Sequence, residues 1–313
     1  MKAIILDQPG GAENLKLTTL DLPVIKNNEV LIQVKAISIN PIDIKTRYGQ
    51  GLYERLKIEV PLILGWDISG IITQVGVDVN DFKVGEEFFG MINFPGHGKA
   101  YAEYVAVPAE QLAIKPINIS HAEAAATTLA ALTAYQSLIQ HGKITPGQRV
   151  LVHAASGGVG HFAVQIARSL GAYVIGTASA ANRDFVLSLG ANEHIDYEAV
   201  RFEEILSDID LVLDTIGGAN TELSLQVTKK GGTVISIITG SSALIAEKAK
   251  EMGIHCYNTS VKSNGDDMRA LAKLLSNGAL KPHIAQSFEL DEISRAHQQI
   301  ETGRTVGKIV VTL

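Results

Sequence analysis

The chain has 313 residues, of which 46% are hydrophobic and 19% are charged, proportions typical of a globular protein rather than a disordered one. Its 27 basic and 33 acidic residues give a net charge of −6, which argues against a surface for nucleic acid or another polyanion. No apolar run approaches the roughly 18 residues that a membrane span needs. We therefore expect about two globular domains, with neither a nucleic-acid nor a membrane partner.

Two further features bear on the cellular compartment. Cys256 is the single cysteine, which excludes an intrachain disulfide and a multi-cysteine zinc site. The first residues, Met1–Asp7, are too short and too soon acidic for a signal peptide and are typical of a first strand. Together they predict a cytoplasmic protein.

Residues 1–117 contain short apolar alternations separated by glycine, proline and asparagine. The segments Glu29–Ile37 and Ile68–Val75 are examples. This pattern predicts a small antiparallel barrel or sandwich. A short helix is expected after Asn40, with the asparagine as its cap and Pro41 at its first position.

The pattern changes at Ser120, which forms a capping box with Glu123 and opens an alanine-rich helix to about Gln140. Buried strands and helices then alternate, which predicts a doubly wound parallel sheet over residues 118–260. From about Val261 we expect two helices and a last strand, Lys308–Leu313, that returns to the edge of the first domain. The strands expected in between are Val150–His153, Tyr173–Thr177, Leu211–Asp214 and Thr233–Ile238, with helices near 160–170, 181–189 and 220–228.

A glycine-rich turn, His153–Gly160, lies between the first of these strands and the helix that follows it. Glycines let the backbone approach a pyrophosphate, and the first N–H groups of the helix then hold the anion. The spacing departs from GxGxxG because Ala155 stands where the first glycine is usual. The candidate phosphate-binding residues are Ser156, Gly157, Gly158, Val159 and Gly160.

The second strand of this domain indicates which nucleotide is bound. An NAD site needs a carboxylate there for the ribose 2′-hydroxyl, but none occurs before Asp184. A 2′-phosphate instead needs a cation and hydroxyl donors, which Ser179, Arg183 and Tyr197 provide. An isolated arginine such as Arg183 is equally consistent with a solvated helix residue. The missing carboxylate favours NADPH as the cofactor.

A series of segments, in order and over nearly the whole chain, resembles the medium-chain dehydrogenase/reductase superfamily. The resemblance is to its zinc-free quinone oxidoreductase branch, the zeta-crystallin-like enzymes. The matching segments are Asn40–Asp43, Pro61–Asp67, Asp81–Gly85, Ala102–Pro108, Ala124–Tyr135, the glycine-rich turn, Asp196–Tyr197, Asp214–Gly218 and Gly307–Val310.

The resemblance implies an α/β protein with a GroES-like β-barrel catalytic domain and an inserted Rossmann domain. The barrel would comprise residues 1–117 completed by 261–313, and the NADPH-binding domain residues 118–260. A cleft between the domains and a homodimer are also implied, and Thr133 joins the expected cofactor-binding residues.

Zinc-dependent relatives bind their metal through an early cysteine, a Gly-His-Glu motif and a second cysteine. Here Asn40 stands at the first position and Gly65-Trp66-Asp67 replaces the second motif. Trp66 either lines the substrate cleft or packs in the core. Because tetrahedral zinc needs three or four soft or imidazole ligands, we expect no metal.

Without a metal, the chemistry expected is hydride transfer from NADPH to a small electrophile, a quinone or an α,β-unsaturated carbonyl. The anion formed is already delocalised, so the protein mainly orients the reactants and supplies a hydrogen-bond donor. Asn40 and Tyr53 are the candidate catalytic residues, although Tyr53 is equally consistent with a packing role. Lys45 stands where relatives often have a further tyrosine.

Two alternatives stay open. An enoyl-thioester reductase would need a basic pocket for its carrier group, and the sequence contains no obvious basic cluster. An NADPH-binding structural or regulatory protein without significant turnover is compatible with the same fold and cofactor site.

Overall fold

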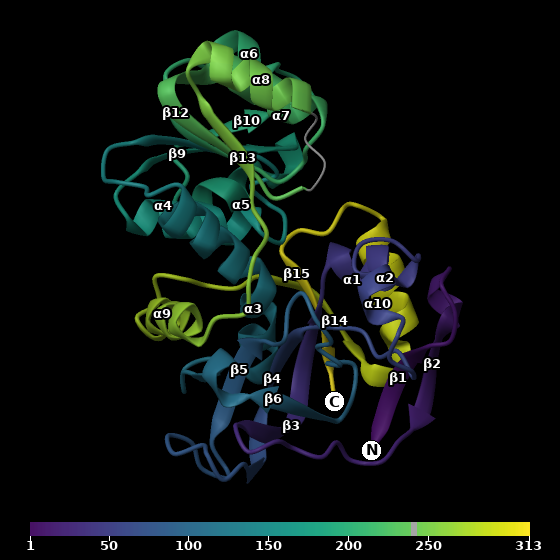
Figure 1. Ribbon diagram of the computed structural model, residues 1–313. Helices are drawn as coiled ribbons and strands as arrows, with labels where there is room; N and C mark the ends of the chain where they lie inside the picture. The colour runs from purple at the N-terminus through teal and green to yellow at the C-terminus, as the bar shows by residue number, and fades with distance from the viewer. Residues whose placement is uncertain (239–242) are drawn as a thin grey trace. The chain divides into compact units, whose positions relative to one another are not determined.

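The computed structural model describes residues 1–238 and 243–313, and its contacts divide the chain into two compact units. Unit 1 comprises Met1–Leu132, Lys262–Gly278 and Pro282–Leu313. Unit 2 comprises Thr133–Val261 and Ala279–Lys281. Figure 1 colours the chain by residue number and labels its elements.

Unit 1 is built around a seven-stranded sheet in the order β14-β15-β3-β4-β5-β7, with β6 also paired to β3. The long strand β3 pairs antiparallel with β4, β6 and β15, so it organises most of the sheet. Strands β1 and β2 form a separate antiparallel pair. The strands are β1 (Lys2–Leu6), β2 (Leu15–Thr19), β3 (Glu29–Ile39), β4 (Asp67–Val75), β5 (Glu87–Met91), β6 (Tyr104–Pro108), β7 (Ala113–Ile114), β14 (Ile284–Glu289) and β15 (Lys308–Thr312).

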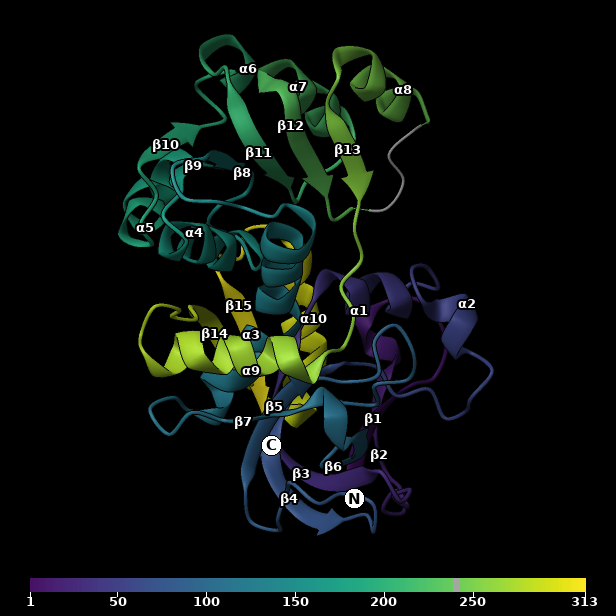
Figure 2. The same ribbon diagram turned by 60° about the vertical axis from the view of Figure 1, so that its left-hand side comes forward.

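The helices of unit 1 begin where the sequence supplies caps. Helix α1 starts at Pro41, and the carboxyl group of Asp43 accepts a hydrogen bond from the Asn40 backbone N–H at 2.6 Å, which confirms the expected start. Figures 1 and 2 show α1 beside α10, and α2 contacts α1. The elements are α1 (Pro41–Arg47), α2 (Tyr53–Leu56), α9 (Gly265–Ser276), α10 (Ile293–Glu301) and the 3₁₀ turns η1 (Ala12–Asn14), η2 (Ala109–Gln111) and η5 (Leu290–Glu292).

The C-terminal strand returns to unit 1, but not at the edge as expected. Strand β15 lies between β14, to which it is parallel, and β3, to which it is antiparallel. The outer strand was missed because β14 is mostly solvent-exposed and polar, and Phe288 is its one fully buried side chain. It therefore lacks the apolar alternation that identifies a half-buried strand.

The division between the units falls inside helix α3 (His121–Tyr135), after Leu132, whereas the sequence places it before this helix. The expected capping box forms, since the Ser120 N–H donates to Glu123 Oε2 at 2.8 Å. Ala125 and Ala126 then pack against Ala36 and Val310 of the sheet. This packing is why the first part of the helix belongs to unit 1. The helix continues as a π-helical segment, η3 (Gln136–His141).

Unit 2 contains a six-stranded parallel sheet in the order β10-β9-β8-β11-β12-β13, the doubly wound order in which the chain reverses direction between β8 and β11. Figures 1 and 2 show α4 and α5 on one face and α7 and α8 on the other. The strands are β8 (Arg149–Val152), β9 (Tyr173–Ala178), β10 (Glu193–Asp196), β11 (Ile209–Asp214), β12 (Thr228–Ser236) and β13 (His255–Asn258). The helices are α4 (Gly160–Ser169), α5 (Arg183–Ser188), α6 (Phe202–Ile205), α7 (Ala219–Val227) and α8 (Ala243–Met252), with the 3₁₀ turn η4 (Ala180–Asn182).

The inner strands of this sheet are buried on both faces. Leu151, Ile175, Val212 and Val234 are fully buried in one core cluster with residues of α7 and α8. Burial on both faces explains why these strands are continuous apolar runs and could be predicted. The short outer strands β10 and β13 carry polar residues and were not predicted.

Unit 1 also buries several ionisable side chains. Arg47 is fully buried and its Nη2 donates to Glu301 Oε1 at 2.5 Å, while the Tyr101 hydroxyl lies 2.9 Å from His297 Nε2. Burial raises the pKa of Asp43 to about 8, and the hydrogen bond from the Asn40 backbone offsets only part of this effect. The folded protein therefore holds this carboxyl in its protonated form at neutral pH.

The burial of Asp43 makes stability depend on pH in a defined direction. The carboxyl has a pKa of about 8 when folded and an ordinary value of 3.8, so between these values the unfolded chain loses the proton first. Its contribution is fully present below the lower value and is lost as the pH rises, by about 1.4 kcal/mol per pH unit. Asp43→Asn, close in shape to the protonated acid, removes this dependence.

Urea unfolding at pH 5 and pH 7 tests this expectation. Between the two pH values the wild-type free energy of unfolding should fall by about 2–3 kcal/mol relative to Asp43→Asn. Asp21→Asn, at an exposed aspartate, is the control and should parallel the wild type. Parallel behaviour of Asp43→Asn would show that the buried carboxyl is already ionised.

Candidate functional site

The carboxyl ends of the parallel strands in unit 2 meet where the strand order reverses, which is where open α/β sheets bind their ligands. The glycine-rich turn follows β8 and leads directly into α4. Its backbone is held in a compact turn, because the Gly157 N–H donates to the Ala154 carbonyl at 2.8 Å and His161 Nδ1 lies 2.8 Å from the Gly157 carbonyl.

The turn requires glycine at position 160 and tolerates alanine at 155. A Cβ at position 160 would lie 2.1 Å from the Ala154 carbonyl oxygen, so no side chain fits there. Ala154, not Ala155, adopts the left-handed conformation, with φ of 47°. Ala155 is fully buried and faces Gly176 of β9, where a Cβ would come within 2.8 Å of the Ala155 methyl group. Because Gly176 has no side chain, the Ala155 methyl group fits against β9, and the turn does not need a glycine at position 155.

A second turn at the strand ends is organised by Asp214, the last residue of β11. Its carboxylate accepts hydrogen bonds from the backbone N–H groups of Ile216 and Gly217, both at 3.0 Å, and from Asn220 Nδ2 at 2.9 Å. Burial raises the pKa of Asp214, but these donors together with the Thr221 hydroxyl outweigh it and the net pKa is lowered. The ionised carboxylate thus holds the turn in place.

His153, directly after β8, is a structural residue between these two turns. It is 1% exposed, with Nδ1 at 3.1 Å from the Thr177 hydroxyl and Nε2 at 3.1 Å from the Ser224 hydroxyl. Burial lowers its pKa to about 4, although the nearby Asp214 acts in the opposite direction. The imidazole is therefore neutral and links β8, β9 and α7.

Two of the predicted cofactor residues, Ser156 and Ser179, are joined by an asparagine that the sequence analysis did not select. Asn182 Nδ2 donates to Ser156 Oγ and to Ser179 Oγ, both at 3.2 Å. The three half-buried side chains come from the turns after β8 and β9 and from η4. The structure thus brings the two serine hydroxyls together at the strand ends.

The remaining predicted cofactor residues differ in their surroundings. The Arg183 side chain is 63% exposed and its Nη1 lies 3.6 Å from Asp184 Oδ1. Tyr197 is also exposed, and its backbone N–H donates to the Ala178 carbonyl at 3.4 Å, which places it beside the end of β9. Gly158 and Val159 are half-buried in the turn. Thr133 is buried within α3.

The structure gives Asn40 a different role from the expected hydrogen-bond donor to substrate. The residue is 1% exposed, and Nδ2 donates to Asp67 Oδ2 at 2.7 Å and, more weakly, to the Ser38 carbonyl at 3.4 Å. Its Oδ1 accepts from Lys308 Nζ at 2.6 Å. Both amide hydrogens are engaged, so Asn40 has no free donor and instead connects a buried carboxylate to a buried lysine.

Tyr53 and Trp66 are placed differently from each other. Tyr53 begins α2 and is half-buried, and no hydrogen bond of its hydroxyl occurs within residues 1–238 and 243–313. Trp66 is fully buried and its Nε1 donates to the Gly96 carbonyl at 2.7 Å, so it is a core residue. Lys45, which stands where relatives often have a tyrosine, is exposed on α1.

Among the described residues, no group of three or more His, Cys, Asp or Glu side chains is arranged to hold a metal ion. In the same parts of the chain, no helix is both long and apolar enough to cross a membrane.

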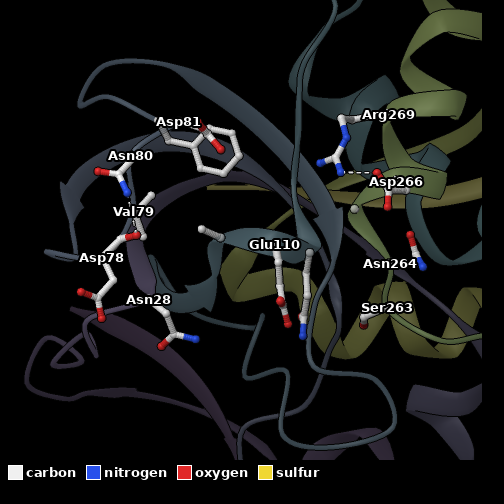
Figure 3. A pocket seen from close by; sticks show the side chains of 14 residues that line it. Asn28, Asp78, Val79, Asn80, Asp81, Glu110, Ser263, Asn264, Asp266 and Arg269 are labelled. Carbon is white, nitrogen blue, oxygen red and sulfur yellow. Dashed lines mark hydrogen bonds and ion pairs between the residues drawn. The ribbon is translucent and has the colours of Figure 1, made fainter.

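Unit 1 contains an open pocket of about 560 Å³ whose charge does not suit a phosphate-bearing ligand. Figure 3 shows Asp78 and Asp81 on one side and the ion pair of Asp266 with Arg269 on the other. With Glu110, four carboxylates face one guanidinium. None of the site residues expected from the sequence lines this pocket, and its negative charge would repel an anionic nucleotide.

Three residues that the sequence analysis missed support the strand-end turns: Asn182, Asp214 and His161. The role of Asp214 could have been predicted from the sequence. An aspartate followed two and three residues later by N–H groups such as those of Ile216 and Gly217 is typical of an Asx turn. No sequence pattern indicated the roles of Asn182 and His161, since their partners depend on how the folded turns meet.

Comparison with known proteins places these features in a family. The model of the alcohol dehydrogenase GroES-like domain matches residues 26–117, and the model described as zinc-binding dehydrogenase matches residues 189–311. The chain is 34% identical to the 2-methylene-furan-3-one reductase of Solanum lycopersicum over 99% of its own length and 79% of that protein.

Two solved structures share the whole fold. The quinone oxidoreductase of Coxiella burnetii is 37% identical with a TM-score of 0.94, and the match covers 100% of this chain and 99% of that one. The quinone oxidoreductase of Escherichia coli complexed with NADPH is 28% identical with a TM-score of 0.89, over 100% of both chains. The expected combination of a GroES-like and a Rossmann domain is thereby confirmed. The chain belongs to the medium-chain dehydrogenase/reductase superfamily, in its quinone oxidoreductase branch.

Proposed function

We propose that this protein is an oxidoreductase that transfers a hydride from NADPH to a quinone or an α,β-unsaturated carbonyl. The observation that carries the proposal is the turn at residues 154–160, shaped for close backbone approach where the sheet reverses. The relatives support the acceptor classes, since two are named quinone oxidoreductases and one reduces a methylene-furanone, an activated enone.

The residues present fit a nicotinamide dinucleotide. The turn closes so tightly at position 160 that no Cβ fits there, and it leads into the N-terminus of the ten-residue helix α4, whose dipole attracts an anion such as the pyrophosphate of the cofactor. When bound, the cofactor supplies the hydride, and the chain's own residues bind and orient it.

Three features favour NADPH over NADH. The end of β9 carries Ser179 and no carboxylate for a ribose 2′-hydroxyl. Arg183 is exposed nearby, and its contact with Asp184 at 3.6 Å is loose and solvent-screened, so the guanidinium remains available to a phosphate. Tyr197 adds a phenol beside the end of β9.

Zinc independence is supported by the donor set around Asn40. Lys308 is buried and its Nζ donates to Asn40 Oδ1 at 2.6 Å and to the Ile39 carbonyl at 3.0 Å. A positively charged or hydrogen-donating group thus stands against the residue at the family's first metal-ligand position, where a cation would be repelled. Hydride acceptors that form delocalised anions do not require a Lewis acid.

Tyr53 is the proposed hydrogen-bond donor to the anion formed on the acceptor. Its hydroxyl makes no hydrogen bond within the described parts of the chain, so it is available to a ligand. Asn40 acts instead as a positioning residue. It links α1, which it precedes, to Asp67 of β4 and Lys308 of β15.

The homodimer and the cytoplasmic location belong to the same proposal and follow from the family resemblance and the cysteine content. Size-exclusion chromatography with light scattering tests the dimer directly.

The function is tested by steady-state turnover with two acceptors, 9,10-phenanthrenequinone and a short 2-alkenal. We expect NADPH oxidation with at least one of them. Tyr53→Phe should lower kcat about 10- to 100-fold with little change in NADPH affinity, because one hydrogen bond to a developing anion is lost. NADPH binding without turnover of either acceptor would favour the structural or regulatory alternative.

Zinc independence predicts that prolonged dialysis against EDTA leaves turnover unchanged, and that elemental analysis of the active protein finds substoichiometric zinc. Zinc binding at Asn40 would first have to displace the Lys308 ammonium. One zinc per chain, together with loss of activity on chelation, would contradict the proposal.

Arg183→Ala tests the cofactor preference. The dissociation constant for NADPH should rise about 10- to 100-fold, because one charge-assisted hydrogen bond to a phosphate is removed. The constant for NADH should stay within about twofold, since NADH lacks that phosphate. The control is Arg269→Ala, which removes another exposed arginine paired to a nearby aspartate, in unit 1. Equal losses for both cofactors would exclude Arg183 from the phosphate site.

A further inference from the structure

Asn182 occupies a helix start without capping it. It stands at the N-cap position of α5, where asparagine side chains commonly accept a backbone N–H, yet its side chain makes no such bond. Instead Nδ2 donates to Ser156 Oγ and Ser179 Oγ, each at 3.2 Å. The amide therefore serves the two serines rather than the helix.

The Asn182 amide leaves the hydrogen atoms of both serine hydroxyls free. An amide nitrogen carries two hydrogens, one for each hydroxyl, and cannot accept. Each serine oxygen is thus an acceptor towards Asn182 and keeps its single hydrogen for another partner. Within residues 1–238 and 243–313, neither hydroxyl donates to a protein group. Two O–H donors from two separate turns are left for the same ligand.

The charges nearby indicate the sign of that ligand. Arg183 follows Asn182 directly, and the acids in this region include Asp184, which is 97% exposed, and Asp196, which pairs with Ala178 of β9. The Asp196 Oδ1 already accepts the Glu198 N–H at 3.1 Å. Two free O–H donors beside an exposed guanidinium match a phosphate, which accepts hydrogen bonds only.

We infer that Asn182 is a positioning residue that directs the hydroxyl hydrogens of Ser156 and Ser179 to the 2′-phosphate of NADPH and so sets the cofactor preference. The inference rests on the proposed function and extends it to a residue that does not itself carry the charge. A general phosphate site needs only positive charge or hydrogen-bond donors. The role inferred here also needs the Asn182 amide between the two hydroxyls, because its two hydrogens bond one serine oxygen each.

Asn182→Asp is the sharpest test, because it changes the amide to a carboxylate of nearly the same shape. A carboxylate only accepts, so both serines would donate to it and withdraw their hydrogens from the phosphate. Its charge would also repel the phosphate. Isothermal titration of the full chain should show NADPH affinity reduced about 100-fold or more, with NADH affinity within about threefold.

Three further variants separate orientation from charge and from folding. Ala181→Asp adds the same charge at an exposed neighbour and should weaken NADPH binding by about threefold at most in physiological salt. Asn182→Ala removes the orienting amide without adding charge and should weaken NADPH about 3- to 10-fold. In a Ser156→Ala/Ser179→Ala background, Asn182→Ala should cost nothing more, because its partners are gone. Thermal unfolding reports whether each variant is folded.

The outcomes distinguish this inference from the proposed function. A wild type that binds neither NADPH nor NADH would overturn the proposed function itself. A wild type that prefers NADPH while Asn182→Asp keeps the same preference would overturn only the role of Asn182. Equal effects of Ala181→Asp and Asn182→Asp, or full additivity in the double-serine background, would also overturn it.

Discussion

Helix α4 begins so close to the turn after β8 that a Cβ at position 160 would lie 2.1 Å from the Ala154 carbonyl oxygen. This close approach determines much of unit 2. It sets where α4 begins after β8, and the N-terminal end of the dipole of this helix attracts an anion. It also places the turn against Gly176 of β9. Ser156 thereby comes within hydrogen-bonding distance of Asn182 after β9, so the proposed subsite for the 2′-phosphate depends on the same contact.

Unit 1 obtains its rigidity by other means. Its sheet is held to the start of α1 by a chain of buried hydrogen bonds from Lys308 through Asn40 to Asp67. Such a chain stabilises only when every member has a partner, because an unpaired polar group in the interior is costly. Asp67 meets this condition with a further donor, the Leu129 N–H at 2.9 Å. Asn40 and Trp66, which the family resemblance relates to two metal-ligand positions of zinc-dependent enzymes, are both buried.

Much of the fold could be predicted from the sequence, because the inner strands of unit 2 are apolar on both faces. Strands β10 and β14 could not, since β10 is a short strand of mostly half-buried polar residues and β14 is mostly exposed, so neither gives a periodic signal. In the proposed nucleotide site, Ser156 was predicted because it lies in the glycine-rich turn, and Ser179 because it ends the second strand of the domain. The roles of Asn40 and Asn182 were not, because each depends on partners from separate segments. Lys308, for example, lies 268 residues from Asn40 in sequence.

The segmented make-up of unit 1 has a consequence for protein synthesis. Residues 133–261 of unit 2 are contiguous, so this unit has nearly all its residues before the last part of the chain is made. The sheet of unit 1 cannot close until β15 has emerged from the ribosome, since that strand lies between β14 and β3. The growing chain must therefore carry an incomplete sheet, in which residues 36–39 of β3 still lack their partner strand, while the nucleotide domain folds. Translation rate and chaperone access during this interval thus bear on the yield of folded protein.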